Sequence, residues 1–197
     1  AGVLSHGVNR THELHLTAAC RFLEDAHEAY EIVALGHTGL WDNELGMARL
    51  RKPADRGGYR MVIVPSVDAL SDEDLQLLSG YAQSGGQLLV TGTDGPDATA
   101  SRDETLRPRG PGALAKLMAN PGKGSVRSLK TFARYLACTT ATCQAAREEL
   151  RDEIGSQAAA RPVHFGDELP PNVWVSSFVH GSGPMTAVHL VNYNVNG

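Results

Sequence analysis

The hydrophobic pattern changes along the chain, from continuous apolar runs in the first half to alternating apolar positions near the end. Residues 59–67 (YRMVIVPSV) and Gln87–Thr91 (QLLVT) are continuous apolar runs, which are typical of strands covered on both faces. Residues 1–5 and 30–35 are shorter apolar segments, each closely followed by a glycine. We therefore predict four buried strands, at residues 3–5, 30–35, 60–64 and 88–91.

Helical periodicity separates these strands. After Thr11, a helix is predicted whose apolar residues share one face, namely Leu16, Ala19, Leu23 and Ala26. A weaker helical pattern covers residues 42–50. Ser71 opens a capping-box pattern in which its hydroxyl accepts from the N–H of Asp74 while Asp74 reaches back, and Gly85-Gly86 end the helix that follows.

Strand, helix and strand joined by short connections require a parallel strand pair and a right-handed crossover. The fold class predicted from this order is α/β: a doubly wound domain with a mostly parallel sheet and helices on both faces. Residues 92–112 follow with no apolar period and are predicted to form a long surface loop, a feature that is often functional.

The pattern after that loop differs from the doubly wound half. Helical periodicity resumes at residues 113–119, 128–136 and 143–154. Val173–Val179 and residues 185–193 are rich in β-branched and aromatic residues and flank His-Gly-Ser-Gly-Pro, a strong turn signal. These two segments are predicted to form a C-terminal antiparallel β-hairpin.

The composition excludes several classes of protein. A length of 197 residues fits one domain or one domain with a small appendage. A net charge of −4 gives no basic face for nucleic acid, and the longest apolar runs are too short to cross a bilayer. The chain opens without Met or a basic leader, so we expect it to come from the middle of a longer protein.

Residues 59–92 resemble a recurring segment of known domains. The segment, YRMVIVPSVDALSDEDLQLLSGYAQSGGQLLVTG, has a strand ending in Val-Pro, a loop reaching Leu-Ser, a helix ending in Gly-Gly and a strand containing Leu-Val. This pattern is similar to the amidotransferase-like domains of large glycosidases, best known as the middle, trimerisation domain of family 42 β-galactosidases. The closing VHLVNYN (188–194) resembles the family's strand that leads into a β-sandwich.

The resemblance implies a flavodoxin-like, three-layer domain related to class I glutamine amidotransferases at residues 1–170, followed at 171–197 by a hairpin leading toward a β-sandwich. It implies a non-catalytic accessory or oligomerisation domain of a larger glycoside-hydrolase-like protein in carbohydrate metabolism, whose catalytic carboxylates sit on a preceding barrel. The expected partners are other domains of the same polypeptide and further copies of the chain, with no cofactor, nucleic acid or membrane. A stand-alone amidotransferase-like hydrolase and a small-ligand-binding module are the alternatives.

No catalytic residue is predicted. An amidotransferase needs a Cys at a strand-to-helix elbow, activated by a His. Gln87–Thr91 instead runs into Gly-Thr-Asp-Gly, and no Gly-x-Ser-x-Gly elbow occurs in the chain. Ser66 is flanked by Pro65 and Val67, which crowd a turn that usually needs small residues. The segment 121–125 (PGKGS) lacks the Walker spacing and is interpreted as a turn.

Candidate ligand-binding residues come from the carboxyl ends of the predicted strands, where ligands gather in open α/β sheets. They are His6, Ser66, Thr93 and Asp94, and ordinary loop solvation is the alternative interpretation.

Other polar groups have structural explanations. His12 and His15 lie three apart at the start of the first helix, where a shared metal site competes with the favoured interpretation of solvent-facing residues. Asp72, Glu73 and Asp74 fit the positive end of a helix dipole, so no metal site is predicted.

The three cysteines leave alternatives open. Cys20 falls in a helical pattern and is interpreted as a small buried hydrophobe. Cys138 and Cys143 are separated by four residues, so a local disulfide competes with two free thiols.

Overall fold

The structure is a computed structural model. It describes residues 2–5, 10–25, 30–35, 41–53, 56–91, 102–103, 105–109, 116, 119–129, 135, 145–146, 148–150, 173–179 and 186–192. In chain order its elements are β1 (Gly2–Ser5), α1 (Arg10–Asp25), β2 (Glu31–Ala34), α2 (Trp41–Leu50), β3 (Met61–Pro65), α3 (Asp72–Gln83), β4 (Gln87–Thr91), β5 (Ser125–Leu129), β6 (Val173–Val179) and β7 (Thr186–Asn192).

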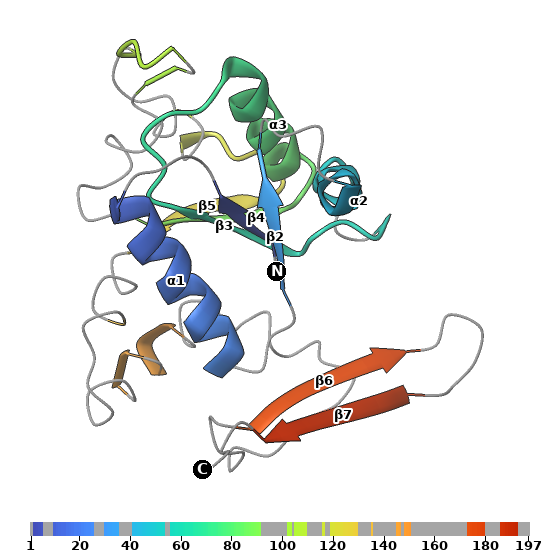
Figure 1. The fold of residues 1–197 in the computed structure, drawn as a ribbon. Coiled ribbons are helices and arrows are strands. Elements are labelled where there is room, and N and C mark those ends of the chain that lie inside the picture. Colours follow the sequence, from blue (N-terminus) through green and yellow to red (C-terminus); the bar gives the residue numbers. More distant parts are fainter. Residues whose placement is uncertain are drawn as a thin grey trace.

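The first five strands form one parallel sheet in the order β2-β1-β3-β4-β5 (Figure 1). This is the flavodoxin-like doubly wound order, in which the direction of winding reverses between β1 and β3. The predicted α/β fold class and the parallel pairing of β3 with β4 are therefore confirmed. Their register sets Val62 opposite Leu88 and, at the carboxyl edge, Pro65 opposite Thr91.

Strand β5 was not predicted from the sequence. The helical pattern expected from residue 128 onward is wrong at its start, because Ser125–Leu129 is an edge strand paired in parallel with β4. Val126 and Leu129 are buried in cores on opposite faces, whereas Arg127 between them is exposed. A partly exposed edge strand needs only a few apolar residues, so it lacks the continuous run that marks β3 and β4.

The helices cover the sheet on both faces (Figure 1). Helix α1 contacts β1 and β3, while α2 contacts β2 and α3 contacts β4. Residues of β3 alternate between the two cores: Met61 and Ile63 join the core under α1, and Val62 and Val64 join the other. The core under α1 also contains Ala18, Ala19, Phe22, Leu23, Leu89, Leu129, Tyr135, Ala146 and Leu150.

Local chemistry explains how α3 begins and ends. The Ser71 hydroxyl accepts from the N–H of Asp74 at 3.0 Å, as predicted, and donates to the Asp74 carboxylate at 2.7 Å. The returning contact thus joins two side chains and does not reach the Ser71 backbone. Gly85 then adopts a φ of +108°, and a Cβ on Gly86 would lie 2.3 Å from the ring of Tyr81. Both glycines are therefore required by the turn into β4.

Strands β6 and β7 form a separate two-stranded antiparallel sheet in which Trp174 is opposite Val191. At residues 121–124 the chain turns, with Gly122 at a φ of +70°, in agreement with the turn predicted there. The predicted helices at 113–119 and 143–154 lie largely outside the described residues.

Candidate functional site

The carboxyl edge of β3 and β4 is the candidate site, because ligands of doubly wound sheets bind beyond this edge near the switch in strand order. Pro65 and Thr91 end the two strands side by side, and both are buried. Ser66 follows Pro65 with a φ of +39°, and its N–H donates to the carbonyl of Thr91 at 2.9 Å. The chain therefore turns sharply away from the sheet at Ser66.

The backbone conformation of Ser66 differs from the expectation that its neighbours, Pro65 and Val67, would crowd a tight turn. Pro65 and Val67 do not prevent a tight turn, since Ser66 occupies the left-handed region that normally favours glycine. Such a backbone costs about 1–3 kcal/mol and persists only where surrounding contacts impose it. The hydrogen bond to Thr91 is one such contact. Strained residues of this kind cluster at functional sites, so Ser66 remains a ligand-binding candidate.

His12 and His15 were interpreted as solvent-facing, and this is wrong. Their exposed fractions are 2% and 3%, because the first turns of α1 lie against the ends of β3 and β4. Nδ1 of His12 donates to the carbonyl of Pro65 at 2.5 Å, and Nδ1 of His15 lies 3.0 Å from the hydroxyl of Thr91. The sequence held a signal for this: the two histidines continue the stripe that buries Ala19 and Leu23.

The contact with Pro65 defines where one proton of His12 lies. A carbonyl only accepts hydrogen bonds, so Nδ1 of His12 carries a proton, whereas the hydroxyl of Thr91 can donate or accept. Burial lowers the pKa of His15, and charge on His12 lowers it further. The His15 ring is therefore held in its neutral form, which suits hydrogen bonding inside the fold.

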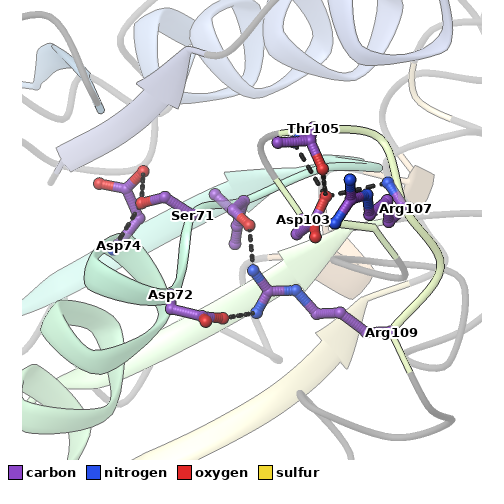
Figure 2. Close-up of polar contacts among 8 residues, drawn as sticks. Ser71, Asp72, Asp74, Asp103, Thr105, Arg107 and Arg109 are labelled. Carbon is purple, nitrogen blue, oxygen red and sulfur yellow. Dashed lines mark hydrogen bonds and ion pairs between the residues drawn. The ribbon is translucent and has the colours of Figure 1, made fainter.

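A second feature at this edge is the strap (residues 102–103 and 105–109), which lies along the connection between β3 and α3. The N–H of Leu70 donates to the carbonyl of Arg102, and the N–H of Arg102 donates to the carbonyl of Asp68, both at 3.1 Å. Figure 2 shows the guanidinium of Arg109 reaching the carboxylate of Asp72, at 2.5 Å. The same guanidinium donates to the carbonyl of Leu70 at 2.5 Å.

Asp103 organises the turn of the strap (Figure 2). Its carboxylate accepts from the hydroxyl of Thr105 at 2.8 Å and from the N–H groups of Thr105 and Arg107, each at 2.9 Å. These hydrogen bonds, that from the Thr105 hydroxyl first, lower the pKa of Asp103. Leu106 is left at the tip with a φ of +63° and an exposed fraction of 63%.

The structure describes only part of the predicted site. Ser66 lies at the carboxyl edge, whereas His6, Thr93 and Asp94 are outside the described residues. Asp72 to Asp74 lie in the first turn of α3, which fits the predicted dipole interaction, but the ion pair of Asp72 with Arg109 was not predicted. In the described part of the chain, no three His, Cys, Asp or Glu side chains gather as a metal site would need.

Of the three cysteines, only Cys20 lies among the described residues. Its thiol is free and half-buried, and burial is the main cause that raises its pKa. A raised pKa lowers the thiolate fraction, so Cys20 is a poor nucleophile. Cys138 and Cys143 lie outside the described residues, and the alternatives for them stay open.

Comparison with known proteins gives a weak structural similarity. No family model and no curated protein matches the chain. Among solved structures, the apo exo-carrageenase GH42 from Bacteroides ovatus is similar, with a TM-score of 0.49 and 12% sequence identity. The alignment covers 97% of this chain and 22% of that enzyme, so the chain spans less than a quarter of its length. Among the described helices, none is both long and apolar enough to cross a membrane.

Proposed function

We propose that this chain is a non-catalytic accessory domain of a larger glycoside-hydrolase-like protein. In this role it packs against other domains of the same polypeptide and against further copies of itself. The observation that carries the proposal is the resemblance of residues 59–92 to the amidotransferase-like middle domain of family 42 β-galactosidases.

The positions of the motif residues of segment 59–92 in the structure support the proposal. Pro65 ends β3, Ser71 caps α3, and Gly85 and Gly86 form the turn into β4. The proline, serine and glycines that carry the resemblance therefore lie at the boundaries of one strand–helix–strand unit. Such an agreement between sequence pattern and element boundaries favours a shared local architecture over a chance match of letters.

The end of β4 also favours a non-catalytic role. In an amidotransferase, the nucleophile stands exposed at a strand-to-helix elbow. Thr91, the last residue of β4, is fully buried and its hydroxyl contacts His15. Ser66 is the nearest described alternative at this edge, and its strained backbone is the observation that keeps a ligand-binding module as a second candidate.

The first experiment tests catalysis. The isolated chain is assayed at micromolar concentration with chromogenic glycosides and with glutamine, and we expect no turnover of either. Turnover near ~1 per second, in the range of ordinary enzymes, would contradict the proposal if Ser66→Ala or Asp94→Ala abolished it. The exposed variant Arg107→Ala is the matched control, because it leaves the strand ends intact.

The second experiment tests assembly. Deleting residues 173–192 removes β6 and β7, and we expect the mass measured by light scattering or the solubility to change. A lone two-stranded hairpin is marginal in water, so these strands need a neighbouring unit to be stable. An unchanged mass together with an unchanged melting temperature would argue against a role of the hairpin in contacts.

A further inference from the structure

The outer face of α1 is exposed. The helix lies along one face of the sheet, and its inner side is buried in the core beneath it (Figure 1). The outer side consists of exposed residues, namely Glu13, Leu14, Thr17, Arg21 and Glu24. Leu14 has an exposed fraction of 48%, so an apolar side chain lies in water among charged ones. This face is therefore accessible to another molecule.

The charges on this face are arranged symmetrically about Thr17. Glu13 lies four residues before Thr17 and Arg21 four residues after it, and the two are opposite in charge. The sequence continues this pattern, because Arg10 and Glu24 are each seven residues from Thr17 and again opposite in charge. When a helix pairs with an antiparallel copy of itself, such a pattern sets each acidic residue opposite a basic one.

Glu13 and Arg21 do not use this complementarity within one chain. Only residues three or four apart are neighbours on the surface of a helix, and eight residues span about 12 Å along its axis. The ion pairs formed among the described residues involve neither side chain. Both charges are therefore available for pairing with another molecule.

An antiparallel pair of α1 helices centred on Thr17 satisfies these groups. Packed helices lie about 8–10 Å apart between their axes, and the small side chain of Thr17 at the centre permits such an approach. At this distance, Glu13 of each copy faces Arg21 of the other, so the same ion pair forms twice. Leu14 then packs beside the methylene stem of Arg21 of the second copy, which removes apolar surface from water.

We propose that the outer face of α1 is a self-association surface, through which two copies of this chain pair about a two-fold axis at Thr17. This pairing rests on the proposed packing of the domain against further copies of itself, and it assigns a surface to that packing. One helix face is smaller than the roughly 800 Å² per partner of a stable interface, so the pairing is reversible and acts as one contact of a larger assembly. Because exposed ion pairs are screened by salt, it weakens as ionic strength rises.

Sedimentation of the full chain over a range of concentrations tests the surface. We expect the mean mass of the native chain to rise with concentration. Glu13→Arg or Arg21→Glu should each weaken association about tenfold, because two attractive pairs become two repulsive ones. The double variant with both changes restores the opposite charges and should associate like the native chain, and so should an equal mixture of the two single variants. Glu44→Arg, at an exposed position of α2, is the matched control and should leave association unchanged.

A native mass that does not change with concentration overturns the pairing, as does a double variant that stays as weakly associated as the single ones. Single variants that associate like the native chain also overturn it, but they leave the proposed accessory role intact, because copies then meet through another surface. Should the variants fold poorly, Thr17→Cys decides, since the two-fold axis sets this residue beside its own copy, within the ~7 Å between Cα atoms that a disulfide requires. A disulfide-linked dimer that forms faster than in Glu44→Cys supports the pairing, and an equal rate overturns it.

Discussion

Replacing Asn43 with alanine removes the polar contact that joins the start of α2 to the edge strand β2. The side chain oxygen of Asn43 accepts from the N–H of Ala34 at 2.9 Å, and its amide nitrogen donates to the carbonyl of Ala34 at 2.7 Å. Asn43 is only 6% exposed, so both hydrogen bonds are partly shielded from solvent. One side chain thus satisfies both backbone groups of a single strand residue.

The cost of this replacement follows from these contacts. Each hydrogen bond contributes a net ~0.5–1.5 kcal/mol, and leaving its partner buried without a replacement costs more. Ala34 is only partly buried, so water can restore some of the lost bonding. Alanine also forms helix better than asparagine, by up to about 0.7 kcal/mol. We therefore expect Asn43→Ala to lower the free energy of unfolding by about 2 kcal/mol.

Urea denaturation followed by circular dichroism measures this loss. With a slope of about 1–3 kcal/mol per molar urea, the midpoint should fall by roughly 1 M. Glu44→Ala, at the exposed neighbouring position of α2, is the control and should change stability by less than about 0.5 kcal/mol. A midpoint for Asn43→Ala equal to that of the control would refute the reasoning, because the hydrogen bonds to Ala34 would then carry no net stability.

Two further predictions concern the turn into β4 and the strap. Gly86→Ala should destabilise the protein by about 3 kcal/mol in the same assay, since the new Cβ would overlap the ring of Tyr81, which two backbone carbonyls hold in place. Gly80→Ala, which meets no atom within 4 Å, should instead be neutral or stabilising, and equal losses for the two would contradict this account. Arg109→Ala should speed proteolytic cleavage within the strap with a global loss of only about 1 kcal/mol, whereas Arg107→Ala should leave the cleavage rate unchanged.

The sequence predicted most of the doubly wound half because its signals there are local. The continuous apolar run before Pro65 marks β3, and the side chain of Ser71 marks the start of α3. Strand β5 was missed because an edge strand is stabilised by backbone pairing with β4 and buries only Val126 and Leu129. A five-residue sequence in which only two residues are apolar fits a helix or a loop as well as a strand.

The candidate site was harder to predict because it depends on contacts between distant residues. Histidines at a helix start are usually hydrated, and only the position of α1 over the strand ends buries His12 and His15. The strap carries no periodicity, and its place is determined by the contacts of Arg109 and by backbone bonds to the connection before α3. Long-range pairs of this kind leave no pattern along the chain.

The contact between Asn43 and Ala34 also limits how copies of this protein can join. In a four-residue edge strand, only Ile32 and Ala34 direct their backbone groups outward, and the amide of Asn43 already occupies those of Ala34. A single remaining residue cannot hold a strand from another molecule. A sheet that continues from one copy into the next along β2 is therefore disfavoured, and any association at this edge would have to be made through side chains.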